Sequence, residues 1–303
     1  FEVAALPLPL EQADAENAEL KKRCEEMSDS DREALDKANE KLLLWQSTPD
    51  SPESKATLPM LSLDEISPLP EKTETFVSEE NGIEVVRYNV PSHGITHFNL
   101  YFTISDLKLE ELSKASLLSE LLGSMPTKKH SVTELEQLIK YYIGSLNFSI
   151  KIYNKYGDRK RCMPKLCVSC SALDSNIKKA VEIITEILTE TDLSNKEMVK
   201  NILLQTEENN RQDSIMNGHR LGMKETLSHY SAAAAANEAV EGASFMRMVH
   251  LLVQGFDKEA DGFIALLDSI LKKSVTMSRL TITVTSDKEN DLMKYISFEN
   301  GSE

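Results

Sequence analysis

Histidine and cysteine are the residues of this chain best suited to bind a metal or to act in catalysis. The six histidines are His93, His97, His130, His219, His229 and His250. A zinc site of the His-x-x-Glu-His type needs a glutamate three residues after a histidine, so that both side chains share one face of a helix. None of the six histidines has Glu at that position. We therefore predict no catalytic zinc site of this type in the chain, and we assign no metal ligands and no catalytic residues.

Three of the four cysteines are closely spaced. Cys162, Cys167 and Cys170 have the Cys-x4-Cys-x2-Cys spacing of a plant-type iron–sulfur loop. Residues 162–172 nevertheless read as a strand, in which residues an odd number apart point to opposite faces. Cys167 would then point away from the other two thiols. We predict reduced, unreactive cysteines, which suit a reducing compartment.

Polar side chains alternate with apolar ones along several predicted strands. In residues 95–105 the apolar face holds Phe98, Leu100, Phe102 and Ile104, and residues 146–154 and 280–285 alternate in the same way. The polar faces supply the candidate binding residues, which are His97, Asn99, Tyr101, Ser149, Lys151, Tyr153, Thr281 and Thr283. An ordinary solvated sheet face would show the same pattern, so the two interpretations stay open.

The elements that would position these side chains form a mixed fold. We predict strands at 73–79, 83–90, 95–105, 146–154, 165–172 and 280–285, with the first three as a meander whose first turn is Glu80-Asn81-Gly82. Helices are expected at 108–122, 131–143, after Asp174, 194–230 and 243–273. Short strand connections and segregated helices predict an α+β fold, an antiparallel sheet covered on one face by helices.

A separate helical arm precedes this domain. One apolar stripe includes Leu20 and Cys24, and a second includes Leu35, Leu42 and Trp45. The two stripes predict an antiparallel helical hairpin, with Ser30 and Glu33 as a capping box at the second helix. Residues 1–53 contain 6 Lys/Arg and 14 Asp/Glu, a net charge of 6 − 14 = −8. Because prolines follow at once, we predict a linker hairpin at 1–53 and the α+β domain at 54–303.

Composition excludes several classes of partner. The net charge is −15 over 303 residues, so we expect no nucleic-acid partner and no basic, aromatic-interleaved patch that would reverse this locally. No run of about 18 apolar residues occurs, and we expect no membrane partner. The chain starts with Phe1 rather than Met. We interpret it as a portion of a longer polypeptide.

The boundary region also carries a family resemblance. The stretch from Trp45 to Glu53 and the stretch from Leu58 to Ile66 resemble the linker and the start of the second half of presequence-protease-like zinc metallopeptidases, a subgroup of the insulinase/pitrilysin family. Three further motifs follow in the family's order: Phe98-Asn99-Leu100-Tyr101-Phe102, residues 117–123 and Asn217-Gly218-His219. The resemblance covers about residues 11–286, the linker hairpin and the third, peptidase-associated domain.

The resemblance implies a non-catalytic role. In such enzymes the first half carries the zinc, and paired α+β domains enclose a peptide chamber with their sheets as its wall. The chain would then be inactive alone and would form part of that wall. Its partners would be the catalytic half and the last domain of its own polypeptide, and unfolded peptide as substrate. By this analogy the polar sheet residues would face the chamber.

One alternative interpretation remains, a stand-alone, non-catalytic binding or assembly subunit with the same fold. The resemblance implies no cofactor in this chain and zinc in the first half of the full enzyme. It also implies a bacterial cytoplasm, or a mitochondrial or plastid matrix in a eukaryote.

Overall fold

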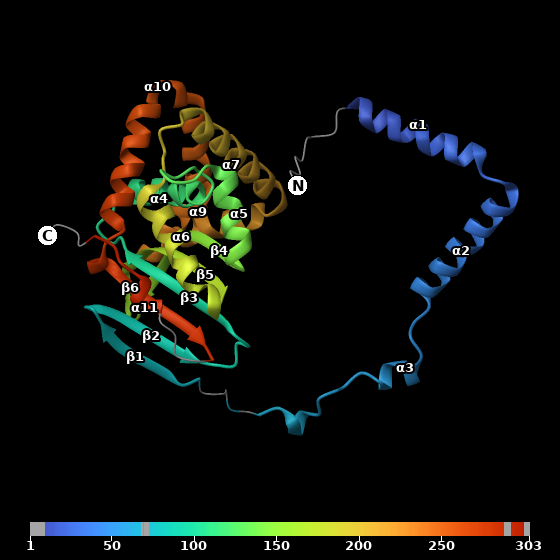
Figure 1. Ribbon diagram of the computed structural model, residues 1–303, viewed down its shortest axis with the longest axis horizontal. Coiled ribbons are helices and arrows are strands. Elements are labelled where there is room, and N and C mark those ends of the chain that lie inside the picture. Colours follow the sequence, from blue (N-terminus) through green and yellow to red (C-terminus); the bar gives the residue numbers. More distant parts are fainter. Residues whose placement is uncertain (1–9, 68, 70–72, 288–291, 300–303) are drawn as a thin grey trace. The chain divides into compact units, whose positions relative to one another are not determined.

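The computed structural model divides the chain into two compact units, Phe1–Pro70 and Glu71–Glu303, which we describe separately (Figure 1). It describes residues 10–67, 69, 73–287 and 292–299, with side chains from residue 17 onward. The sequence-based boundary between residues 53 and 54 stays a prediction.

The first unit is a series of helices whose described side chains form no core. Its helices are α1 (Leu10–Glu26), α2 (Asp29–Ser47) and α3 (Pro52–Ala56). Its described side chains are exposed, except that of Met27, which is half-buried. The predicted stripes therefore do not bury each other: Leu20, Leu35 and Trp45 are 58%, 49% and 74% exposed. The predicted capping box is also wrong, because Ser28 caps α2 by accepting a hydrogen bond from the Asp31 N–H (3.2 Å).

A six-stranded sheet forms the base of the second unit. Its strands are β1 (Thr75–Glu80), β2 (Ile83–Asn89), β3 (Ile95–Thr103), β4 (Ser145–Lys155), β5 (Asp158–Leu173) and β6 (Leu280–Ser286). The spatial order is β1-β2-β6-β3-β5-β4. The predicted meander of the first three strands is therefore wrong. The C-terminal strand β6 lies between β2 and β3, parallel to β2 and antiparallel to β3, a long-range pairing that local turn signals do not reveal.

The turn between β1 and β2 agrees with the sequence. Asn81 and Gly82 have φ values of 55° and 77°, and the strands pair antiparallel with Glu80 opposite Ile83. Both central residues of a type I′ turn need positive φ, which asparagine and glycine tolerate best. This two-residue turn sets the register of the hairpin.

Helices cover one face of the sheet. They are α4 (Leu109–Leu121), α5 (Val132–Tyr142), α6 (Ile177–Glu190), α7 (Lys196–Met216), α8 (Gly218–Ser228), α9 (Ala232–Glu241), α10 (Ala243–Ser274) and α11 (Leu292–Tyr295). Helices α4, α6 and α9 contact the strands, and α7 and α10 pack on α4, with α10 also on α9 (Figure 1). The α+β fold with helices on one sheet face is confirmed.

Helix boundaries differ from the predictions at two places. The helix predicted over 194–230 is broken at Asn217, which ends α7 and precedes α8. Asn195 caps the start of α7, because its side chain accepts a hydrogen bond from the Met198 N–H. The alanine run after Ser231 is helix α9, which alanine's helix propensity explains.

Alternate residues of β3 separate the core from the open face. Phe98, Leu100 and Phe102 are 0%, 1% and 0% exposed. Burial of each such side chain contributes about 1.5–3 kcal/mol to folding. Their neighbours in sequence point the other way and are half-buried or exposed.

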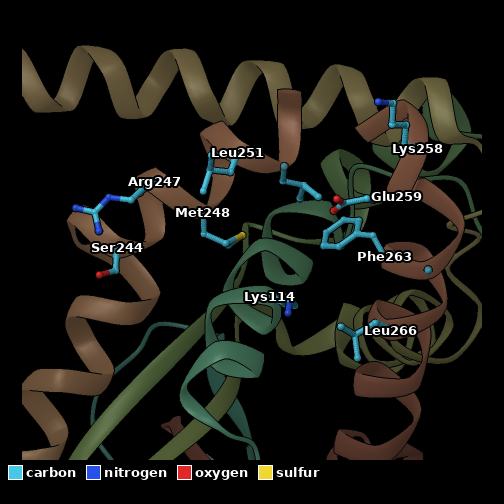
Figure 2. A pocket seen from close by; sticks show the side chains of 11 residues that line it. Lys114, Ser244, Arg247, Met248, Leu251, Lys258, Glu259, Phe263 and Leu266 are labelled. Carbon is cyan, nitrogen blue, oxygen red and sulfur yellow. The ribbon is translucent and has the colours of Figure 1, made fainter. Parts of the chain in front are cut away.

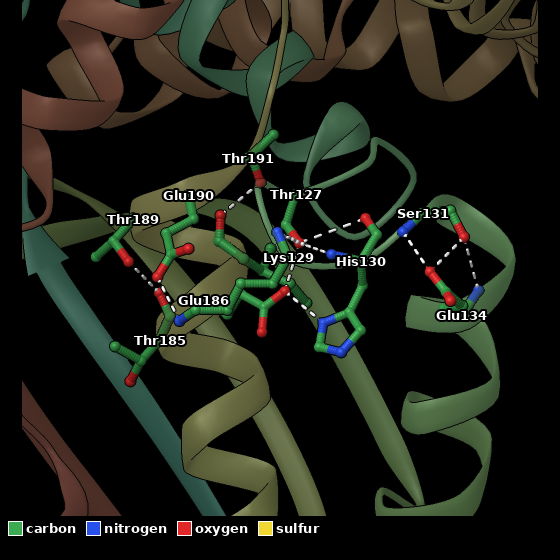
Figure 3. Close-up of polar contacts among 11 residues, drawn as sticks. Thr127, Lys129, His130, Ser131, Glu134, Thr185, Glu186, Thr189, Glu190 and Thr191 are labelled. Carbon is green, nitrogen blue, oxygen red and sulfur yellow. Dashed lines mark hydrogen bonds and ion pairs between the residues drawn. The ribbon is translucent and has the colours of Figure 1, made fainter.

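A polar cluster attaches the loop after α4 to helix α6 (Figure 3). The buried Glu186 carboxylate accepts a hydrogen bond from the Thr127 hydroxyl and lies 2.8 Å from Nδ1 of His130. Nearby, Lys129 and Glu190 form an ion pair at 2.7 Å. Because every polar atom named here has a partner, the cluster fixes the start of α5 without a large desolvation cost. Its arrangement is structural.

Among the described residues, no helix is long and apolar enough to cross a membrane.

Candidate functional site

The eight candidate side chains lie on one face of the sheet. On the central strand β3, Asn99 pairs with Thr283 of β6 on one side and with Ser169 of β5 on the other. Paired residues of neighbouring strands point to the same face. The same registers place Tyr101 beside Thr281, and β4 adds Ser149, Lys151 and Tyr153 beyond β5. The structure thus gathers all eight predicted residues into one surface, which we call the polar face.

Strand β5 contributes residues that the candidate set lacks. Lys165, Cys167, Ser169 and Ser171 pair with β3 and β4 residues of the polar face and lie between them. The alternation of Leu166 and Val168 with these residues is the sequence pattern that could have identified them as part of the polar face. The strand order, which places β5 between β3 and β4, is what makes them central to the face.

Tyr101 is the centre of the polar face. Its ring lies edge-on to that of Tyr153, with centroids 6.2 Å apart, and the Lys165 ammonium lies 5.8 Å from its ring centroid. Burial, with the neighbouring Cys167 and Tyr153, raises the pKa of Tyr101 to about 12. The phenol is therefore neutral near pH 7 and acts as a hydrogen-bonding group with an apolar ring.

Hydrogen bonds between side chains arrange the rest of this face. The Asn99 amide donates to the Thr283 hydroxyl at 2.9 Å, and the Ser145 and Ser171 hydroxyls are 2.7 Å apart. Amide, hydroxyl, phenol and ammonium groups in this arrangement can bind the backbone of an extended peptide.

The cysteines lie as the strand assignment predicted. Cys167 belongs to the polar face and Cys170 to the opposite face, and both are buried. Burial raises the pKa of Cys167, and it raises the pKa of Cys170 to about 12. Both thiols stay protonated at neutral pH, so neither is an activated nucleophile.

Metal ligands are not grouped in the part of the chain that the structure describes, where no three His, Cys, Asp or Glu side chains come together. His93 and His97 are four residues apart, but they lie on a turn with positive φ and on strand β3. Thr96 occupies the position that a His-x-x-Glu-His site needs for glutamate. The described residues therefore do not fit a zinc site of this type.

One charged region differs from the expectation of a uniformly acidic surface. The β4–β5 hairpin contains six cations against one acid, Asp158, within residues 151–165; the cations are Lys151, Lys155, Arg159, Lys160, Arg161 and Lys165. Tyr153 and Tyr156 are interleaved with them. The expectation of no such patch is therefore wrong. The net charge of the whole chain is a sum over all residues and does not show a local excess of cations.

A depression also lies on the helical side of the sheet, between α10 and α4. Its volume is about 860 Å³, and Met248, Leu251 and Phe263 are among its apolar lining residues (Figure 2). Lys114, Arg247 and Lys258 also line it. Leu251 is 59% exposed. This apolar surface lies away from the polar face, on the opposite side of the sheet.

The comparisons with known proteins agree on one family. The family model for the region associated with M16 peptidases of subfamily C matches residues 8–252. Protein HypA of Clostridium perfringens is 28% identical over 233 residues, covering 76% of this chain and 24% of that protein. Presequence protease 1 of Arabidopsis thaliana, described as chloroplastic/mitochondrial, is 25% identical and covers 86% of this chain and 24% of its own length.

Two further matches extend this result. The mitochondrial presequence protease of Schizosaccharomyces pombe is 24% identical, covering 82% of this chain and 24% of that protein. A conserved protein of Enterococcus faecalis V583 has the same fold in its crystal structure, with a TM-score of 0.52 at 13% identity, covering 75% of this chain and 53% of that one. The chain thus spans about a quarter of the length of these curated relatives. The presequence-protease-like resemblance is confirmed, and the chain belongs to the family of regions associated with M16 peptidases of subfamily C.

Proposed function

We propose that the chain is a non-catalytic portion of a zinc metalloendopeptidase that degrades unfolded peptides, and that its polar face forms part of the wall of a closed peptide chamber. The observation that carries the proposal is the gathering of all eight candidate side chains on the uncovered face of the sheet. The opposite face is buried beneath helices. Of the two faces of the sheet, the polar face is therefore the one whose side chains a peptide could reach.

The contribution of this chain would be binding and orientation. Asn99, Tyr101 and Thr283 offer donors and acceptors for a peptide backbone, and Lys151 offers a charge for an acidic group. Zinc, expected in the catalytic half of the polypeptide, would supply the activated water there. Closure of the two halves would exclude bulk water and limit substrates to unfolded chains that fit.

Exposed apolar side chains support the proposal that the partner of this chain is the rest of the same polypeptide. In the first unit, Trp45, Met60 and Leu63 are 74%, 84% and 88% exposed. The depression between α10 and α4 adds Leu251 and its neighbours. Apolar surface of this extent is typical of interfaces, which favours a portion of a larger enzyme over a finished, stand-alone subunit.

The compartment is part of the same proposal. A bacterial cytoplasm, or a mitochondrial or plastid matrix, would keep thiols reduced. The four cysteines of the described structure are free, in agreement with such a compartment.

A binding experiment tests the proposal. Fluorescence anisotropy with a labelled, neutral, unfolded peptide would compare the 303-residue chain with Lys151→Ala/Tyr153→Ala on the polar face. Loss of about two hydrogen bonds predicts roughly tenfold weaker binding. The matched control is Tyr141→Ala/Lys178→Ala on exposed helix positions. Equal affinities of both variants, or no binding by the unmodified chain, would contradict a peptide-contacting polar face.

Catalysis gives a second test. The 303-residue chain with added zinc should leave a quenched fluorogenic peptide intact over hours. Zinc-dependent cleavage that is removed by a chelator would show a catalytic site in this chain and contradict the non-catalytic role.

A further inference from the structure

The outer edge of β4 borders an open groove. The strand is the last of the sheet and pairs only with β5 among the described strands. A cavity of about 440 Å³ beside it is lined by five consecutive strand residues, 147–151. Successive residues point to opposite faces of a strand, so a cavity lined by all five runs along the strand's edge. Backbone N–H and C=O groups at such an edge are available to an added strand.

The far wall of this groove consists of helical side chains. Asn209, Asn210 and Asp213 of α7 and Arg220 and Lys224 of α8 line it. The Nδ2 atom of Asn210 is buried and has no hydrogen-bond partner. Unsatisfied buried donors are rare in folded proteins, and a backbone carbonyl that entered the groove would be an acceptor for this side chain.

The hairpin at one end of the groove is basic. Residues 151–165 carry a net charge of 6 − 1 = +5, and the rest of the chain carries −15 − 5 = −20. Within the described residues, Arg161 is the one cation of the six with an ion pair, to Asp158 at 2.6 Å. Tyr156 is fully exposed at the tip, where Lys155, Arg159 and Tyr230 line a depression of about 480 Å³. Unpaired cations beside aromatic rings favour an acidic ligand.

We propose that the edge of β4 binds an extended acidic polypeptide segment as an added antiparallel or parallel strand, with its acidic side chains at the basic hairpin tip. Backbone hydrogen bonds to β4 give affinity, and the tip selects for charge. The inference rests on the proposed function for the peptide nature of the ligand, and it names the binding mode and the substrate class.

A peptide fits the groove better than a nucleic acid. Along the groove, Lys151, Arg220 and Lys224 are balanced by acids, which are Glu120, Asp213 and Glu241. Lys224 and Glu241 are already paired at 3.2 Å. A phosphate backbone carries a charge at every nucleotide and would meet these acids, whereas a peptide can place its charges at the tip alone.

The test uses fluorescein-labelled 12-residue peptides and the 303-residue chain, with anisotropy as the readout. One peptide has an uncharged β-forming segment followed by a Glu/Asp block, and a second has Lys in place of that block. A third repeats the acidic peptide with alternate residues N-methylated, which removes strand hydrogen bonds and keeps the side chains. We expect the acidic peptide to bind at least tenfold more tightly than the other two.

Charge reversal at the tip tests the location. Arg159→Glu/Lys160→Glu should weaken binding of the acidic peptide about tenfold and leave an uncharged peptide unaffected. The matched control, Lys178→Glu/Lys179→Glu on helix α6, should leave both affinities within twofold. Thermal melting by circular dichroism verifies that each variant is folded.

The outcomes separate this inference from the proposed function. If an uncharged peptide binds the polar face but N-methylation and tip charges have no effect, the inference is overturned and the proposed function stands. If no peptide binds, both fail. Tighter binding of a 12-nucleotide single strand than of the acidic peptide would also overturn the inference, because it would assign the basic tip to nucleic acid.

Discussion

The two faces of the same sheet differ in what their side chains are able to do. On β3, Phe98 and Phe102 are 0% exposed beneath the helices, whereas His97 is exposed and Asn99 and Tyr101 are half-buried. Because successive residues of a strand point to opposite faces, the difference follows from the face on which each side chain lies. One face stabilises the fold, and the other retains polar groups that a ligand can reach.

The largest expected effect follows from replacing neighbouring residues of the two faces. Phe98→Ala leaves a cavity in the core and should lower the free energy of unfolding by about 3–5 kcal/mol. His97→Ala, one residue earlier on the polar face, should change it by less than about 0.5 kcal/mol. Urea denaturation measures both. Similar losses for the two variants would show that both faces are packed.

A smaller effect is expected where β3 leaves the sheet. Arg279 donates two hydrogen bonds to the Asp106 carboxylate, at 2.5 and 3.1 Å, and Lys273 lies 2.7 Å away. These interactions lower the pKa of Asp106 below its usual value, Arg279 contributing most. Because the side chain is 37% exposed, solvent screening limits the loss for Asp106→Asn to about 1 kcal/mol.

The pH dependence of this effect has a definite sign. A lowered folded-state pKa gives stability that is present above the unfolded pKa of about 4 and is lost as the pH falls. The difference between wild type and Asp106→Asn should therefore shrink steadily as the pH is lowered from about 4 to about 2. A difference that stays constant over this range would contradict the ion pair, and Asp268→Asn on exposed α10 provides the control.

The titration of Tyr101 at high pH should distinguish a half-buried tyrosine of the polar face from an exposed one. Its pKa is raised to about 12, above the unfolded value near 10. The raised pKa contributes to the stability of the folded chain below pH 10. This contribution is lost as the pH rises toward 12, because the tyrosine ionises first in the unfolded chain. Ultraviolet titration should show one tyrosine ionising near pH 12, which Tyr101→Phe removes. Removal of the same step by Tyr156→Phe would assign it to the exposed hairpin tip.

The smallest expected effect is a difference in labelling rate between two buried cysteines, one on each face of the sheet. Cys170 is covered by helices, whereas Cys167 is covered on the polar face beside Tyr101. Tyr101→Ala should speed labelling of Cys167 by a maleimide and leave Cys170 protected, as mass spectrometry of peptides would show. Equal acceleration at both cysteines would indicate general loosening of the sheet.

Alternation was sufficient to predict the two faces. The apolar spacing of Phe98, Leu100 and Phe102 placed the polar residues of the same strand on its opposite face without knowledge of strand order. The order itself was not predictable, because the β2–β6 pairing joins residues 84–89 to 281–286 and depends on tertiary packing. For the same reason the contribution of β5 to the polar face was missed.

The helical arm shows a different limit of sequence patterns. Stripes such as Leu35 and Leu42 predicted two helices, and α1 and α2 are present. A stripe does not reveal what covers it, and these side chains are exposed in the structure. Helical periodicity therefore predicted the elements but not the packing between them.

Site-specific photo-crosslinking tests peptide contact with the polar face most directly. A benzoylphenylalanine at Thr281, on the polar face, would be compared with one at Lys178, an exposed position of α6, each in the 303-residue chain with a biotinylated unfolded peptide. We predict crosslinking at position 281 that excess unlabelled peptide suppresses, and none above background at position 178. Equal crosslinking at the two positions, or crosslinking at 178 alone, would contradict it.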